Sequence, residues 1–268
     1  MTNDQRRSAY LEEIGIGPLW KRRFPPSETT GVSEPVVEQL PGIPTHQEAF
    51  LAEPAVPGTS MAPAAETHAF SKYDPAVIAR MDWATLKETV SGCTKCDLCQ
   101  SRTHTAFGVG DEKAKWLFVG EGPGRNEDLR GEPFVGQAGK LLDNMLLALG
   151  LKRGENAYIA NIVKCRPTDA AGKDRPPTAE ESAACIPYLQ RQISLIQPAI
   201  IVALGKTAAL SLLNLRPDTP VSKLRGTVHT YADRPLVVTY HPAYLLRNLA
   251  DKKKAWEDLC LAMATYGR

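Results

Sequence analysis

The sequence predicts an α/β protein: a three-layer α/β/α domain with a central, mostly parallel four-stranded sheet, preceded by a disordered N-terminal extension. Short apolar runs alternate with amphipathic helical patterns from about residue 73 to the end of the chain. The runs are continuously apolar, as is typical of parallel strands that are covered on both faces. Before residue 73 the composition changes, and eight prolines fall between Pro25 and Pro63.

The chain therefore divides into three parts. The sequence of residues 1–23 predicts either a short amphipathic helix or a frayed tail. If a helix forms, we expect it to dock on a protein partner. Residues 24–72 are predicted to form a disordered linker, because this Pro- and Glu-rich tract, without Lys or Arg from Phe24 to Ser71, cannot bury enough apolar surface to offset its ordering entropy. Residues 73–268 form the predicted α/β domain.

The elements of that domain follow from the periodicity. A helix is expected over 77–90, before the first cysteine pair. Buried parallel strands are expected at 116–119, 158–163, 199–204 and 236–239, and helices at 138–149, 179–196, 206–213 and 252–266. Ligands bind at the carboxyl ends of the strands in open sheets of this kind. The segment Gly120–Gly124 and His241 follow strands directly, so we expect both at that edge.

Composition narrows the class of protein. A hydrophobic content of 43% and a charged content of 23% are ordinary for a soluble protein. No apolar run reaches the roughly 18 residues of a spanning helix, and no signal core follows the N-terminus, so we expect a cytoplasmic protein without membrane contact. Residues 72–268 carry 27 basic and 21 acidic residues, and this excess suits a polyanionic partner.

Four cysteines have a spacing suited to a metal centre. Cys93 and Cys96 form a C-x-x-C pair, while Cys165 and Cys185 are separate. In a reducing compartment such cysteines are ligands or buried thiols rather than disulfides. Four thiolates hold either an iron–sulfur cluster or tetrahedral zinc, and unligated cysteines are the third interpretation. Cys99 is a possible competing ligand, and Cys260, in the last predicted helix, is interpreted as a buried apolar residue.

The glycine segment does not match the common nucleotide-binding loops. Pro123 and the acidic residues that follow do not fit the G-x-G-x-x-G fingerprint, and the phosphate-loop lysine is missing. The longer string from Gly120 to Leu142 resembles the first motif of the iron–sulfur uracil-DNA glycosylases (family 4). Over roughly residues 85–265 the same resemblance covers Cys93-x-x-Cys96-x-Leu98, Asn161-Ile-Val-Lys-Cys165-Arg-Pro167, Ala203-Leu-Gly205, Leu224-Arg-Gly226 and His241-Pro-Ala-Tyr-Leu-Leu-Arg247.

The resemblance implies an enzyme that flips uracil out of DNA and hydrolyses its N-glycosidic bond, leaving an abasic site. Glu121 is the favoured catalytic carboxylate, with Asp128 as the alternative group that positions water. His241 would donate a hydrogen bond to uracil O2. The implied uracil-binding residues are Glu121, Gly122, Glu127, Phe134, Asn161 and His241, with Phe134 stacking on the base and Asn161 reading its edge.

The resemblance also implies a [4Fe-4S] cluster on Cys93, Cys96, Cys165 and Cys185, as a structural brace. Tyr244, Leu245, Leu246 and Arg247 would form the loop that enters the duplex, with Leu246 as an apolar wedge and Arg247 on a phosphate. Lys164, Arg166 and Arg225 are further candidate contacts to the DNA backbone. We expect a monomer. The rival hypotheses are a non-enzymatic iron–sulfur adaptor on DNA or protein and a zinc-binding nucleotide hydrolase.

Overall fold

The structure is a computed structural model that describes residues 71–267. The predictions made for residues 1–70, namely the N-terminal helix or tail and nearly all of the linker, lie outside the described residues. Within the described part of the chain, no helix is long and apolar enough to cross a membrane.

A six-stranded sheet with the order β1-β3-β2-β4-β6-β5 forms the centre of the domain. The four inner strands are parallel, as predicted, and the two outer strands pair antiparallel with their neighbours. The prediction of four strands is wrong because the two edge strands lack an apolar run: one has two residues, and the other alternates between exposed and half-buried positions. The strands are β1 (Val109–Gly110), β2 (Trp116–Gly120), β3 (Ala157–Asn161), β4 (Ile200–Leu204), β5 (Val228–Tyr231) and β6 (Arg234–Thr239).

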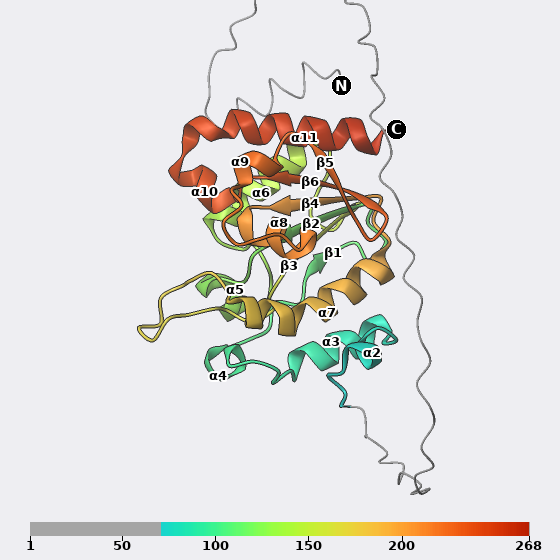
Figure 1. The fold of residues 1–268 in the computed structure, drawn as a ribbon, viewed down its shortest axis with the longest axis vertical. Helices are drawn as coiled ribbons and strands as arrows, with labels where there is room; N and C mark the ends of the chain where they lie inside the picture. The colour runs from blue at the N-terminus through green and yellow to red at the C-terminus, as the bar shows by residue number, and fades with distance from the viewer. Residues whose placement is uncertain (1–70, 268) are drawn as a thin grey trace, which may run out of the picture. The chain divides into compact units, whose positions relative to one another are not determined.

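Helices connect the strands and cover both faces of the sheet (Figure 1). The helix predicted over 77–90 is two helices, because Asp82 accepts a hydrogen bond from the Thr85 N–H (2.8 Å) and starts a new helix there. The helices are α2 (Pro75–Ile78), α3 (Trp83–Ser91), α4 (Leu98–Ser101), α5 (Arg125–Arg130), α6 (Gln137–Ala148), α7 (Ala179–Ile196), α8 (Lys206–Leu213), α9 (Val221–Leu224), α10 (Pro242–Arg247), the 3₁₀ turn η1 (Leu249–Asp251) and α11 (Lys252–Tyr266).

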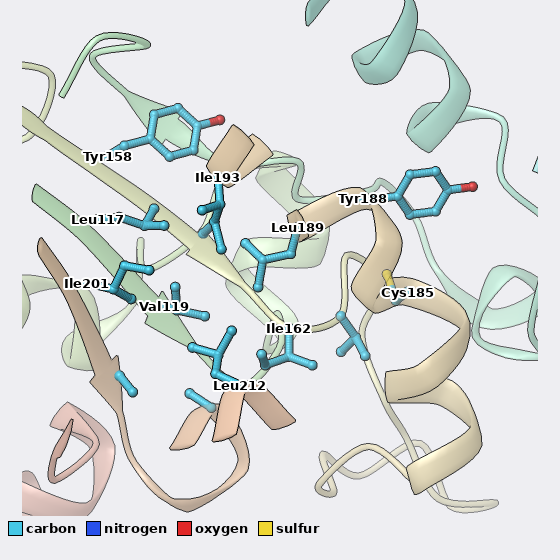
Figure 2. Close-up of a cluster of buried hydrophobic side chains, with 14 of the residues drawn as sticks. Leu117, Val119, Tyr158, Ile162, Cys185, Tyr188, Leu189, Ile193, Ile201 and Leu212 are labelled. Carbon is cyan, nitrogen blue, oxygen red and sulfur yellow. The ribbon is translucent and has the colours of Figure 1, made fainter. Parts of the chain in front are cut away.

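Two apolar clusters separate the layers, because successive strand residues point to opposite faces. Leu117 and Val119 of β2 belong to one cluster, together with residues of α2, α3, α7 and α8. Figure 2 shows part of this cluster, with Leu189 and Ile193 of α7 on the side of the sheet that carries Leu117 and Val119. Trp116 and Phe118 belong to the other cluster, with α6 and α11. The three-layer α/β/α prediction is therefore confirmed.

The carboxyl ends of the inner strands position the candidate site. β2 ends at Gly120 and β3 at Asn161, and the sheet register pairs these two residues. β4 ends at Leu204 and β6 at Thr239, which are also paired. The segments that follow these four strands therefore meet along one edge of the sheet.

Helix α6 offers a matched test of the packing. Leu142 is fully buried beneath it, whereas Leu147 on the same helix is 63% exposed. We expect Leu142→Ala to lower the free energy of unfolding by about 2–5 kcal/mol, because it leaves a cavity. Leu147→Ala should change that free energy by less than about 0.5 kcal/mol. Urea unfolding followed by circular dichroism measures both, and equal effects of the two substitutions would contradict this packing.

Candidate active site

A cleft opens at the carboxyl edge of the sheet. Its walls come from the segment after β2, the start of α6, the segment after β3 and the start of α10. Five of the predicted site residues line it: Glu121, Gly122, Glu127, Phe134 and His241. Residues that the sequence did not single out also line it, among them Arg125, Asn126, Gln137, Asp174 and Arg175.

Glu121 is the first residue after β2 and is half-buried. Its carboxylate accepts a short hydrogen bond from the hydroxyl of Thr207, at the start of α8. Sequence reasoning missed Thr207. The signal available was a hydroxyl residue in the first turn of a helix that follows a strand at the same sheet edge.

Glu127 holds the start of α6 in place. One oxygen of its half-buried carboxylate accepts hydrogen bonds from the backbone N–H groups of Val135 and Gly136, both at 2.9 Å. These N–H groups flank the beginning of α6, where a negative charge is favourable. Glu127 therefore fixes the backbone beside Phe134 and also contributes negative charge to the cleft.

Asp128 is buried away from the cleft, which contradicts its prediction as a water-positioning group. It is 4% exposed and does not line the cleft. Its carboxylate accepts a hydrogen bond from the Thr103 N–H (2.9 Å), which ties α5 to the segment after α4. Glu127 and Asp128 are neighbours on a helix, so their side chains point in different directions.

Phe134 and Asn161 meet at Gly120. A Cβ atom at Gly120 would lie 2.5 Å from both Asn161 Oδ1 and Phe134 Cζ, so only glycine allows this approach. Asn161 is 1% exposed, and its Oδ1 has no hydrogen-bond partner among the described residues. A buried amide oxygen without a partner is costly, so this atom is available to a ligand.

His241 stands at the start of α10 and faces the ring of Phe134, with 5.5 Å between the ring centroids. Its Nδ1 accepts a hydrogen bond from the Ala243 N–H (3.1 Å), which assigns the proton of the neutral ring to Nε2. Burial, with the positive charge of Arg247, lowers the pKa of His241 from 6.5 to about 4, although Glu127 acts in the opposite direction. His241 is thus a neutral hydrogen-bond donor at neutral pH.

The segment predicted to enter a duplex is helix α10, and only part of it is exposed. Leu245 is fully buried among core residues, which contradicts its prediction as a DNA contact. Tyr244 is half-buried, stacks on Tyr240 and donates a hydrogen bond to Asp251 (2.7 Å). Leu246, 42% exposed, and Arg247 remain accessible. Leu249 in the following turn is 58% exposed, and sequence reasoning missed it.

The cysteines surround a separate hollow. Its lining includes the predicted ligands Cys93, Cys96, Cys165 and Cys185, and also Cys99. Cys260 lies outside the hollow and packs against the opposite cluster. Within residues 71–267, no group of three or more Cys, His, Asp or Glu residues is arranged to hold a single metal ion. The thiols line the wall of this hollow.

Polar donors face these sulfur atoms. Tyr188 donates to Cys93 Sγ (3.2 Å), the Lys164 N–H to Cys185 Sγ (3.3 Å) and Arg102 to Cys165 Sγ (3.3 Å); Figure 2 shows Cys185 and Tyr188 on α7. Burial raises the pKa of the Cys165 thiol to about 11 and that of Cys185 to about 12. Thiolates facing such donors fit a cationic metal centre, which would remove these protons on binding.

Lys164 links the hollow to the cleft. It is 1% exposed, and its ammonium donates to the backbone oxygen of Asn161 (2.9 Å) and to Gln192 (2.7 Å). Burial lowers the pKa of Lys164 to about 8. A lysine in this position cannot reach a DNA phosphate, so the predicted contact is wrong, and the side chain instead supports the turn that carries Asn161.

The other two predicted phosphate contacts are engaged within the protein. Arg166 forms an ion pair with Asp174 (2.5 Å). Arg225 forms an ion pair with Asp258 (3.1 Å) and donates to the backbone oxygen of Lys254 (2.7 Å). Their guanidinium groups stabilise local structure, which their sequence positions do not reveal.

The segment that forms this sheet and cleft matches a known protein family. Residues 107–260, more than half of the chain, match the family described as the uracil DNA glycosylase superfamily, and the chain belongs to it. The family resemblance predicted from the sequence is confirmed.

Within this family the chain is similar to proteins called type-4 uracil-DNA glycosylases. It is 46% identical over 164 residues to the one of Archaeoglobus fulgidus, covering 59% of this chain and 79% of the relative. The identity is 44% over 168 residues with the one of Thermotoga maritima, covering 62% and 84%. It is 44% over 180 residues with the one of Sulfurisphaera tokodaii, covering 65% and 80%.

The lowered pKa of His241 gives a test of the site. The ring should take up its proton near pH 4, and near neutral pH its proton should lie on Nε2. Between pH 6.5 and 4 the unfolded chain binds the proton and the folded chain does not. This histidine therefore lowers stability as the pH falls through that window.

Nitrogen-15 NMR of histidine-labelled protein measures the midpoint and the tautomer, and His241→Asn identifies the resonance. A midpoint near 6.5, or a proton on Nδ1 at neutral pH, would contradict the geometry. The same substitution should also reduce the loss of stability between pH 6.5 and 4.

Proposed function

We propose that this protein is a DNA repair glycosylase that flips uracil out of DNA and hydrolyses its N-glycosidic bond. The products are free uracil and an abasic site. The observation that carries the proposal is the meeting of Glu121, Phe134, Asn161 and His241 at one sheet edge, in a chain of this family.

Base recognition would rest on Phe134 and Asn161. A uracil buried in the duplex is out of reach, so it must leave the stack. Phe134 offers a ring face for stacking. The Asn161 amide can donate to uracil O4 through its N–H and accept from N3–H through Oδ1. Cytosine reverses both groups, and the unpartnered Oδ1 supports this reading of the base edge.

Bond cleavage would rest on His241 and Glu121. When the bond between C1′ and the base nitrogen breaks, the sugar gains positive character and the uracil departs with the electron pair. The neutral His241 would donate its Nε2 proton in a hydrogen bond to uracil O2 and stabilise that charge. Glu121 would orient the water that adds to C1′ and take up its proton. Its negative charge would also stabilise the developing cation.

The four cysteines of the hollow would hold a [4Fe-4S] cluster: Cys93, Cys96, Cys165 and Cys185. Bound there, the cluster would supply a structural cross-link between the segment after α3, the segment after β3 and helix α7. The lining of the hollow and its hydrogen-bond donors support this assignment. Cys99 lines the same hollow and remains the alternative ligand.

Duplex contact would come from the exposed residues around α10. Leu246 and Leu249 are apolar and accessible, as needed for a wedge that fills the gap left by the flipped base. Arg247 beside them would hold a phosphate.

Glu121→Gln tests the assigned catalytic carboxylate. It should lower the single-turnover rate of uracil excision about 10²- to 10⁴-fold, because the amide cannot take up the proton of the attacking water. The measurement uses oligonucleotides with one uracil, followed by alkaline cleavage of abasic sites. Asp128→Asn is the matched control and should excise at a rate near that of the wild type.

Near-full excision by Glu121→Gln would rule out this role for Glu121. A wild-type protein that binds the oligonucleotide and leaves uracil in place would instead support the non-enzymatic adaptor.

Cys165→Ala tests the cluster. Wild-type protein purified without oxygen should be brown and contain about four iron atoms per chain. Cys165→Ala should lose most of the iron and the visible absorbance and melt at a lower temperature. Cys260→Ala should keep the iron, because Cys260 lies outside the hollow. Colourless wild-type protein with one zinc ion would exclude the cluster.

A further inference from the structure

We propose that Thr207 is a positioning residue, which holds Glu121 in the orientation needed to direct the attacking water. The inference rests on the proposed function. It adds a residue behind the cleft that does not itself contact DNA or base.

The contact joins two strands of the sheet. Glu121 follows β2, and Thr207 is the second residue of α8, which follows the neighbouring parallel strand β4. The Thr207 hydroxyl donates to Glu121 Oε2. Glu121 lines the cleft, whereas Thr207 does not, so the hydroxyl approaches the carboxylate from behind.

In many active sites the partner of a catalytic carboxylate is a charged side chain. Here the Glu121 carboxylate is held by a neutral hydroxyl. A carboxylate has two oxygens, and the bond to Thr207 occupies Oε2. Oε1 is then left for a water molecule in the cleft. The first turn of α8 also places backbone N–H groups on this side, which favours negative charge.

The same turn contacts the other catalytic residue. Gly205, two residues before Thr207, has a φ of +90°, and a Cβ there would lie 2.8 Å from His241 Cβ. The backbone of this turn therefore packs against His241 at Gly205, while the side chain of Thr207 binds Glu121. The turn between β4 and α8 sets the distance between the carboxylate and the imidazole, the two groups that would act on opposite sides of the breaking bond.

Removal of the hydroxyl tests the inference without a large change in volume. Thr207→Val should lower the single-turnover excision rate about 10- to 100-fold, because the carboxylate loses a charge-assisted hydrogen bond and can rotate. The KM for uracil-containing DNA should change less than about twofold. Thr207→Ser keeps the hydroxyl and should recover most of the rate. Ser211→Ala removes a hydroxyl elsewhere on α8 and serves as the control for folding.

A double-mutant cycle separates positioning from general stability. If Thr207 acts through Glu121, Thr207→Val should have no further effect on the rate of Glu121→Gln. A rate for Thr207→Val within threefold of wild type would overturn the inference, as would equal losses in both backgrounds. A wild-type protein that excises no uracil would overturn the proposed function itself, so the two failures are distinguishable.

Discussion

The register of the four inner strands is the constraint on which the site depends. Gly120 of β2 pairs with Asn161 of β3, and Leu204 of β4 pairs with Thr239 of β6. A shift of one residue between β2 and β3 would turn every side chain of the shifted strand to the opposite face. It would separate the Asn161 amide from Phe134, which meet only because Gly120 carries no side chain. Cleft geometry and core packing are therefore specified by the same backbone hydrogen bonds.

The second constraint is the set of hydrogen bonds that Arg102 donates around the cysteines. Arg102 donates to the backbone oxygens of Cys93 (2.7 Å) and Ser91 (3.0 Å) and to Cys165 Sγ (3.3 Å). Lys164, beside Cys165, continues the connection to the backbone of Asn161. The segment from Asn161 to Cys165 thus carries a proposed cluster ligand, Cys165, at one end and the proposed base-reading residue, Asn161, at the other. A loosening of the cysteine region would therefore disturb the position of Asn161, because Cys165 is only four positions further along the chain.

Periodicity predicted the buried elements well, because burial determines their pattern. The bounds of α7, α8 and α11 agree with the sequence prediction, and Thr178 and Glu181 form a capping box at the start of α7. The edge strands escaped prediction because half-exposed residues leave no apolar run. The directions of side chains also escaped it: the turns of α5 and α10 bury Asp128 and Leu245, and neither burial follows from a motif. Thr207 was missed because its partner comes from another strand.

Helix α10 has a mechanical consequence. Its N-cap residue, His241, lines the cleft, and its last residues, Leu246 and Arg247, are exposed. The helix has only six residues, and Leu245 anchors it in the core. In the proposed reaction, a force on Leu246 from the duplex would be transmitted to the imidazole through less than two turns of rigid backbone. Insertion of Leu246 into the duplex and stabilisation of the leaving group by His241 would thus be coupled through one short helix. The position of the imidazole would then depend on whether the nucleotide has been flipped out.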